Sequence, residues 1–412
     1  MATTREAISD DDRRAFAEQV VRKLRDAGRI ALFAGGCVRD LLLGKTPKDY
    51  DVATDAPPEA VRKLFPRTLA IGASFGVIQV RGEPGLEVEV ATFRSDGPYQ
   101  DGRRPESIEF ATPEADAARR DFTINGMFFD PVARQVIDYV DGEADLKAGV
   151  VRAIGDPRAR FEEDKLRLLR AVRFAARFDF EIDPASELAI QQMASGLLVV
   201  SAERILQELR LLLPPPYRRR SLALLDRVGL LGVVFPEVAA AGRLADLDLL
   251  FAAWPNEVSL PLALAGLLAF IPDDRAPRLA EDLCRRLRAT NEEREACVWL
   301  CRHCSDFDGW GAAPTHFRKR LFAEPGIEDL LELARASGRA DEVAAARAWR
   351  AGLTDADISP PPLLTGDDLR AAGYAPGPAF KLWLDRIRDA QLDGAIATPA
   401  EALALARRLA GS

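Results

Sequence analysis

The chain has 412 residues, 48% of them hydrophobic and 29% charged, and a formal net charge of −8. That length allows about two to three domains of ordinary size, and no stretch approaches the ~18 uninterrupted apolar residues that a membrane span requires. An acidic chain repels phosphate backbones, so any nucleic-acid contact must use local basic patches. Five cysteines and an N-terminus without an apolar signal segment indicate a cytoplasmic protein without disulfides.

The first third of the chain alternates short apolar runs with turns, which predicts an α/β head. In chain order the runs are "IALFAGG", "KDYDVAT", "FGVIQVRG", "LEVEVATFR" and "ARQVIDYV". From about residue 156 the pattern turns helical, as in "FEEDKLRLLRAVRFAARF" and "SAERILQELRLLL", with proline-rich breaks at 214–220 and 359–366. We therefore predict a head over 1–140, a helical neck over 141–215, and a helical body and tail over 216–412.

The first apolar run ends in Gly35-Gly36, just before a helix predicted to start near Val38. Glycine allows close approach to the backbone, and free amides at a helix start favour an anion. Arg39 on the first turn can add a charge-assisted bond to a phosphate. A tight strand-to-helix turn without a ligand remains the alternative.

Two aspartates follow this turn, Asp49 and Asp51 in "KDYDVAT". On a strand, side chains two residues apart point to the same face, so the two carboxylates should converge. Such like charges repel unless a cation lies between them, and oxygen ligands of this kind suit Mg²⁺ with substrate phosphates. We interpret the pair as a site of phosphoryl or nucleotidyl transfer, against the alternative of a solvated turn.

The segment "FAGGCVRDLLLGKTPKDYDVAT" closely resembles the signature of the class II tRNA nucleotidyltransferase and bacterial poly(A) polymerase family. The likeness continues in the same order through "ARRDFTINGMFFD", "DYVDGEADLKAGVVRAIGDP", "FEEDKLRLLRAVRFAARF" and "SAERILQEL", and covers roughly residues 30–240. This resemblance implies a polymerase-beta-like nucleotidyltransferase head followed by an all-helical neck, body and tail.

The resemblance also implies roles for particular residues. Asp49 and Asp51 would hold Mg²⁺ for attack of an RNA 3′-hydroxyl on a nucleotide, and Glu89 in "EVEVATFR" would be a third catalytic carboxylate, unless it only decorates a solvated strand. The nucleotide-binding residues would be Gly36, Arg39, Arg120, Asp121, Asp164, Arg167, Arg170 and Arg173, with Asp121 accepting from the ribose hydroxyls.

We predict that the segment 163–178 forms one helix and that this helix selects the base of the nucleotide. At 100° per residue, an apolar face (Leu168, Leu169, Val172, Ala175 and Ala176) opposes an arginine face (Arg167, Arg170, Arg173 and Arg177). Arginines one turn apart repel, so we predict that a polyanion stabilises the arginine face, against the alternative of a solvated basic surface. Asp164 and Arg167, neighbours on this helix, would accept from an amino group and donate to a ring nitrogen. That pair fits C and A and rejects U and G, because a mismatch leaves buried polar groups unpaired.

The predicted reaction is addition of CMP, CMP and AMP from CTP and ATP to the 3′ end of tRNA, without a membrane or DNA as partner. The loop 94–110, with glycines and prolines, indicates full CCA addition by its resemblance to the family. The alternatives are a poly(A) polymerase, a small-molecule nucleotidyltransferase and a non-catalytic RNA-binding protein. The resemblance disfavours poly(A) addition, because poly(A) polymerases of this family typically carry a Gly-Arg-Arg-Phe segment after the acidic strand and a strongly basic C-terminal extension. Here "IGASFGVIQV" lacks an arginine pair and the end "ARRLAGS" is short.

Three further signals are ambiguous in the sequence. The basic runs "YRRR" (217–220) and "HFRKR" (316–320) could contact tRNA or form solvated helix faces. Pro376-Gly377-Pro378 precedes a predicted helix and could bind a phosphate or form a plain turn. Cys297, Cys301 and Cys304 follow i, i+4, i+7 spacing, which favours a buried helical stripe over a zinc site. The oligomeric state is not encoded in any of these patterns.

Overall fold

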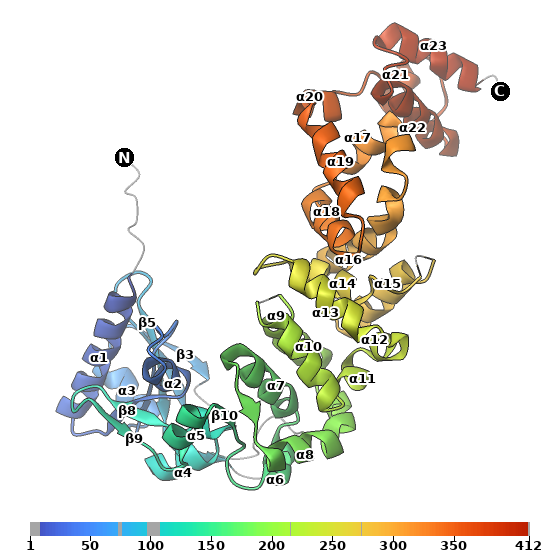
Figure 1. The fold of residues 1–412 in the computed structure, drawn as a ribbon. Coiled ribbons are helices and arrows are strands. Elements are labelled where there is room, and N and C mark those ends of the chain that lie inside the picture. The colour runs from blue at the N-terminus through green and yellow to red at the C-terminus, as the bar shows by residue number, and fades with distance from the viewer. Residues whose placement is uncertain (1–8, 73–75, 97–107, 215, 273, 411–412) are drawn as a thin grey trace. The chain divides into compact units, whose positions relative to one another are not determined.

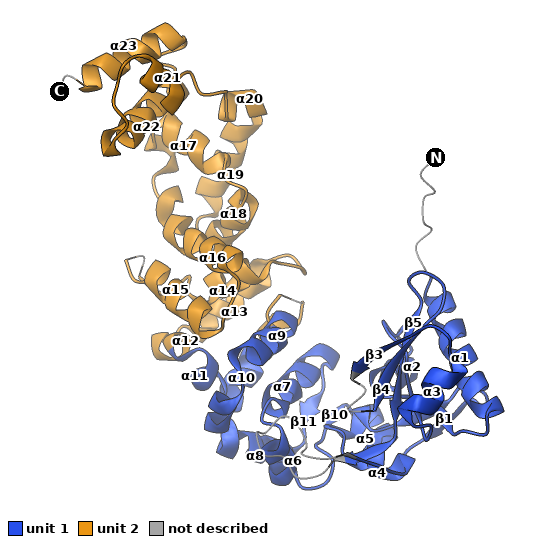
Figure 2. Ribbon diagram, turned by 180° about the vertical axis from the view of Figure 1, so that it is seen from behind, with its two compact units in different colours: residues 1–212, 220–236 blue, residues 213–219, 237–412 orange. Residues whose placement is uncertain are grey.

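The computed structural model describes residues 9–72, 76–96, 108–214, 216–272 and 274–410 (Figure 1). The chain forms two compact units, Met1–Leu212 with Arg220–Pro236 and Leu213–Arg219 with Glu237–Ser412 (Figure 2). No helix within the described ranges is both long and apolar enough to cross a membrane. The boundaries near residues 140 and 215 stay a prediction, because head and neck lie together in the first unit.

A seven-stranded mixed sheet organises the head, in the order β3-β4-β5-β2-β1-β8-β9 within the described residues. The strands are β1 Ala31–Ala34, β2 Asp51–Thr54, β3 Thr68–Gly72, β4 Val77–Arg81, β5 Glu87–Thr92, β8 Phe128–Asp130 and β9 Gln135–Ile137. β2 and β5 run parallel, with Asp51 opposite Glu89, and the other pairs are antiparallel. The central position of β2 fixes the acidic segment next to β5.

Apolar residues on both sheet faces explain why helices cover the head. Leu32, Ala34 and Ala53 pack with Phe93 and Phe128 in one cluster. The helices of the head are α1 Asp10–Asp26, α2 Gly36–Leu42, α3 Pro58–Leu64, α4 Pro113–Ala118 and α5 Gly142–Ala148, with a 3₁₀ turn at Thr123–Asn125. Ser9 and Asp12 form a capping box that starts α1. The two ends of the loop 94–110, which is predicted to indicate full CCA addition, pair as the hairpin β6 Arg94–Asp96 and β7 Ile108–Phe110. The rest of this loop, 97–107, lies outside the described residues.

The neck contains α6 Pro157–Glu163, α7 Arg167–Phe178, α8 Pro184–Met193 and α9 Ala202–Leu212, with a small parallel pair of β10 Val150–Val151 and β11 Glu181–Ile182. The predicted apolar face of α7 is confirmed: its five residues are at most 3% exposed. The prediction of one continuous helix is wrong at its start. Asp164 has φ −146° and ψ 101° and ends α6, so it lies in a break before α7.

The second unit is helical throughout its described part. Its helices include α13 Leu244–Ala253, α14 Leu260–Leu267, α15 Ala276–Arg286, α16 Asn291–His303, α17 Thr315–Phe322, α18 Ile327–Ala336, α19 Ala340–Ala351, α21 Gly366–Ala371, α22 Pro378–Leu392 and α23 Pro399–Ala410. Cys297, Cys301 and Cys304 are buried free thiols, which confirms the helical stripe. The last three helices share their own core around Leu369, Ile387 and Ala402.

The basic run 217–220 is not a uniform surface. Arg218 is 2% exposed and donates to the carbonyl oxygens of Pro214, Pro255 and Asn256. The interpretation of this arginine as a tRNA contact is therefore wrong, because its guanidinium satisfies carbonyls inside the second unit. Pro378 does begin a helix, α22, as predicted.

Candidate active site

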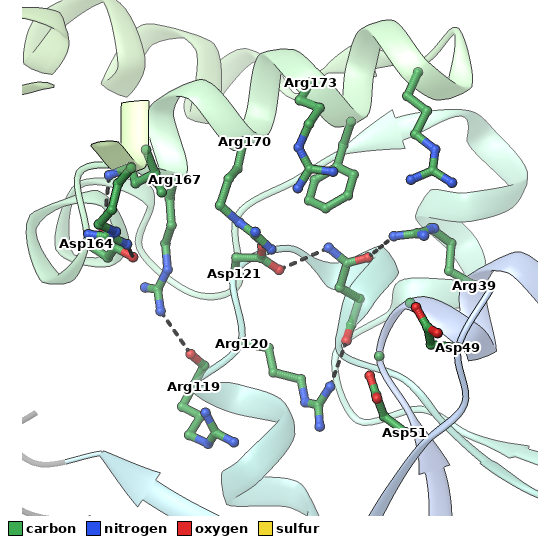
Figure 3. A pocket seen from close by; sticks show the side chains of 17 residues that line it. Arg39, Asp49, Asp51, Arg119, Arg120, Asp121, Asp164, Arg167, Arg170 and Arg173 are labelled. Carbon is green, nitrogen blue, oxygen red and sulfur yellow. Dashed lines mark hydrogen bonds and ion pairs between the residues drawn. The ribbon is translucent and has the colours of Figure 1, made fainter. Parts of the chain in front are cut away.

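A pocket of about 750 Å³ in the first unit brings the predicted residues together. Figure 3 shows Asp49 and Asp51 on one wall and Arg167, Arg170 and Arg173 of α7 on the opposite wall. The predicted residues that line it are Gly36, Arg39, Asp49, Asp51, Arg120, Asp121, Asp164, Arg167, Arg170 and Arg173. Glu89 is not part of this lining; it lies on β5, opposite Asp51 in the parallel register.

The two aspartates reach the pocket by a route that differs from the prediction. Asp51 is the first residue of β2, but Asp49 precedes the strand in a bend. Between them, Tyr50 is 5% exposed and its ring lies 5.3 Å from that of Phe33. The buried tyrosine keeps the alternation of inward and outward side chains without a strand ladder, so both carboxylates line the same pocket (Figure 3).

The Asp51 carboxylate is electrostatically crowded. Burial among neighbouring protein atoms and then the negative charges of Glu89 and Asp49 raise its pKa to about 6, although Arg120 opposes the shift. Solvent still reaches Asp51, because the pocket is open. Within the described ranges, no three histidine, cysteine or acidic side chains are arranged to hold a metal by themselves. Asp49 and Asp51 therefore offer hard oxygen ligands whose repulsion a cation would relieve.

The glycine turn lies beside this carboxylate wall. Gly35 adopts φ +73°, and a Cβ there would come within 2.9 Å of Arg120 Nη1, so the position requires glycine. Gly36 begins α2, as the predicted short helix requires. Arg39 is 4% exposed and donates to Asp40 Oδ1 and, at 2.5 Å, to Asn125 Oδ1. Its guanidinium is therefore already held by protein groups at the pocket wall.

A buried acid–arginine pair joins the head to α7. Arg170 donates from Nε at 2.9 Å and Nη2 at 2.6 Å to Asp121 Oδ2. Asp121 Oδ1 accepts from the Phe122 amide and from Asn125 Nδ2. Burial alone would raise the pKa of Asp121, but Arg170 and Asn125 outweigh it and lower that pKa to about 2. Asp121 is thus ionised at any ordinary pH, and both of its oxygens are engaged.

The pair predicted to select the base, Asp164 and Arg167, lies at the other end of the pocket, in and after the α6–α7 break. Asp164 Oδ2 accepts from Arg204 Nη2 at 2.7 Å, and Arg167 Nη1 donates to Glu163 at 2.7 Å. Arg167 also donates to the carbonyl oxygens of Arg160 and Arg119. Each side chain of the pair is therefore held by its own partner, and the two lie in one pocket although they are not on one helix.

The acidic partners of the arginine face were missed by the sequence analysis. Arg173 Nε donates to Glu208 at 2.6 Å, and Arg167 and Arg170 pair with Glu163 and Asp121. These internal acids offset much of the repulsion for which a bound polyanion was predicted. No local pattern singled out Glu208, because its helix α9 also carries the charged residues Glu203, Arg204 and Arg210.

Two family models match parts of this chain. Residues 31–152 match the model of the poly A polymerase head domain, and residues 179–241 match the probable RNA and SrmB-binding site of polymerase A. The CCA-adding enzyme of Geobacillus stearothermophilus is 42% identical over 212 residues, which are 51% of this chain and 52% of that protein. Poly(A) polymerase I of Haemophilus influenzae is 38% identical over 246 residues, 57% of this chain and 54% of that protein.

These matches span about half the length of both curated relatives. A crystal structure of the Bacillus stearothermophilus CCA-adding enzyme in complex with CTP aligns over 96% of this chain and 97% of that chain, with a TM-score of 0.76 and 28% identity. The predicted fold class and the family resemblance are confirmed by these matches. The roles of individual site residues stay predictions.

Crowding at Asp51 has a measurable consequence for stability. Because the folded state binds the Asp51 proton more tightly than the unfolded chain does, stability is lost as pH rises from about 4 through about 6. Asp51→Asn should therefore stabilise the protein at pH 8 in EDTA, by on the order of 1 kcal/mol once solvent screening is allowed for. At pH 4 the two proteins should unfold at the same urea concentration, followed by circular dichroism. The raised pKa of Asp51 would be contradicted if the unfolding midpoints of the two proteins differed equally at both pH values, or if Asp51→Asn were less stable than the parent at pH 8.

Proposed function

We propose that this chain, whose head belongs to the poly(A) polymerase head family, adds CMP, CMP and AMP from CTP and ATP to the 3′ end of tRNA. The observation that carries the proposal is one pocket that combines a carboxylate wall, a glycine turn and an acid–arginine pair. Support comes from the CCA-adding enzymes among its relatives and from the CTP complex that aligns with almost the whole chain. A cytoplasmic location belongs to the same proposal, because all five cysteines are buried free thiols.

Nucleotidyltransferases of this family generally use a divalent metal, and the residues of this chain fit one. We infer Mg²⁺, held by Asp49 and Asp51, with Glu89 next to Asp51 on the neighbouring strand. When bound, the ion supplies Lewis-acid stabilisation of negative charge on phosphate oxygens. The raised pKa of Asp51 fits this assignment, since a cation would remove the repulsion that raises it.

The proposed reaction is an in-line displacement. The 3′-hydroxyl oxygen of the RNA bonds to the α-phosphorus, the bond from that phosphorus to the bridging oxygen breaks, pyrophosphate leaves, and the hydroxyl proton passes to solvent. Gly36 and Arg39 lie at the helix start where the triphosphate would bind. Arg120 lies between this turn and Asp121, and it is oriented by Asp116. Both oxygens of Asp121 already accept hydrogen bonds from the protein. Asp121 would therefore accept from a ribose hydroxyl through a lone pair that these bonds leave free.

Selection of the base would use Asp164 and Arg167. A carboxylate oxygen can accept two hydrogen bonds, and a guanidinium carries five N–H groups. The Arg204 and Glu163 contacts therefore fix both side chains while leaving capacity to read a base edge. In this proposal an amino group donates to Asp164, and Arg167 donates to the adjacent ring nitrogen, which fits C and A.

A poly(A) polymerase is the second candidate, because one of the curated relatives carries that activity in its name. Both activities would use the same pocket. The distinguishing experiment incubates purified protein with tRNA lacking its 3′ end and Mg²⁺. Labelled CTP and labelled ATP are supplied separately and then together. Addition that stops after three nucleotides supports CCA synthesis, a long ladder of A supports the poly(A) alternative, and no addition supports a non-catalytic RNA binder.

The metal assignment is tested by Asp49→Ala in the same assay. We expect loss of at least about 1,000-fold in nucleotide addition, because one of two oxygen ligands is removed from the site where charge develops. Binding of tRNA, measured by fluorescence anisotropy, should change less than about twofold. Lys147→Ala, at an exposed lysine paired with Glu143, serves as the matched control. Addition at near-normal rates by the Asp49 variant would refute the role.

The base-reading assignment is tested by Asp164→Asn. An amide can donate or accept at this position, so the variant should lose discrimination between CTP and UTP by roughly 10- to 100-fold. The measurement is kcat/KM for each nucleotide on the same truncated tRNA. Asp156→Asn is the control, since this carboxylate caps α6 without lining the pocket. Unchanged discrimination in the Asp164 variant would remove this residue from base selection.

A further inference from the structure

One cation of the pocket differs from all the others. Eight arginines line it, and seven form an ion pair with an acidic side chain: Arg39, Arg119, Arg120, Arg167, Arg170, Arg173 and Arg204. The eighth, Arg177, is exposed and has no ion pair or hydrogen bond from its side chain within the described part of the chain. Its positive charge is therefore not offset by the protein.

Arg177 lies against the ring of Phe178, and a second cation, Lys45, which has no acidic partner within the described ranges, lies against the same ring. The Phe178 ring centroid is 5.2 Å from Arg177 Cζ, 5.1 Å from Lys45 Nζ and 4.5 Å from Arg39 Cζ. Lys45 is exposed and likewise has no acidic partner among the residues that the structure describes. A ring face offsets only about 0.5–1 kcal/mol per exposed cation. Lys45 and Arg177, which we call the Phe178 cation pair, therefore form a local excess of positive charge.

The position of Arg177 along the pocket indicates which part of a bound nucleotide it would contact. Arg177 lies ten residues after Arg167, which is about 15 Å along α7. Arg167 belongs to the base-reading end, whereas Arg177 lies near Arg39, whose Nη2 would be 3.5 Å from a Cβ on Gly36. Arg177 therefore lines the pocket at its glycine-turn end, opposite the end proposed to read the base. Lys45 does not line the pocket itself, but its ammonium group lies against the same Phe178 ring as Arg177.

We propose that Arg177 and Lys45 bind the terminal phosphates of the incoming nucleoside triphosphate, and afterwards the pyrophosphate that leaves. The inference rests on the proposed function for the identity of the nucleotide. A polyphosphate needs cations that internal acids have not already neutralised, and charge-assisted bonds to phosphate are about twice as strong as neutral ones. The seven paired arginines offer oriented N–H donors to a ligand, and the Phe178 cation pair adds uncompensated positive charge at the glycine-turn end.

The test is equilibrium binding of inorganic pyrophosphate with Mg²⁺, measured by calorimetry on the full chain. Arg177→Ala and Lys45→Ala should each weaken binding about five- to tenfold, and the double variant by about 50-fold. Arg177→Lys should retain affinity within about threefold, because the charge remains. Arg22→Ala and Lys147→Ala are the controls, at exposed cations paired on α1 and α5, and should bind as the parent does. Matching circular dichroism and unfolding midpoints exclude a folding defect.

Steady-state kinetics separate the possible sources of phosphate. The proposal predicts a higher KM for CTP and a higher inhibition constant for pyrophosphate in both alanine variants, with KM for the truncated tRNA unchanged. A raised KM for tRNA with unchanged pyrophosphate affinity would assign the pair to the RNA backbone and overturn the proposal. Unchanged values throughout would also overturn it, because the pair would then be solvated surface charge. Two results together would separate this inference from the proposed function: the parent protein adds no nucleotide, and the alanine variants bind pyrophosphate more weakly than the parent. In that case the proposed function fails and the phosphate site stands.

Discussion

The contact between Asp121 and Arg170 is the constraint on which the pocket depends. Asp121 lies in a bend of the head, and Arg170 lies in the first turn of α7. Two N–H groups hold one carboxylate oxygen while Phe122 and Asn125 hold the other, so the carboxylate cannot rotate. Removing Arg170, which is itself partly exposed, would leave the buried Asp121 carboxylate without its main counter-charge and destabilise this contact. The pair thereby fixes α7 opposite Asp49 and Asp51 (Figure 3).

The remaining acid–arginine pairs extend the same principle along α7. Glu208 comes from α9 and Glu163 from α6, and together with Asp121 they hold three successive arginines of α7. Arginines kept in one orientation need not be ordered when a ligand arrives, which lowers the entropic cost of binding. The pocket is therefore dense in cations and yet compatible with a chain of net charge −8. An acidic protein can bind a polyanion when its basic groups are concentrated and oriented in one cavity.

Much of this site follows from local rules that sequence alone supplies. The glycine turn, the alternation around Tyr50 and the apolar face of α7 depend on neighbours in the chain, and each is present in the structure. Local rules failed where tertiary contacts took over. Asp49 lies off the strand, and Asp164 lies in a helix break where Arg204, forty residues away, determines its orientation. Partners such as Glu208 were not predictable, because long-range pairing leaves no local periodic signal.

The most direct test of this account is a double-mutant cycle on Asp121 and Arg170, with equilibrium binding of CTP as the readout. Asp121→Asn, Arg170→Met and the combined variant would be compared with the parent by calorimetry. The account predicts strong coupling: each single change weakens CTP binding at least about tenfold, and the second change adds little once the first is made. Losses that simply add would show that the two residues act independently, and that the head–neck pair does not organise the pocket.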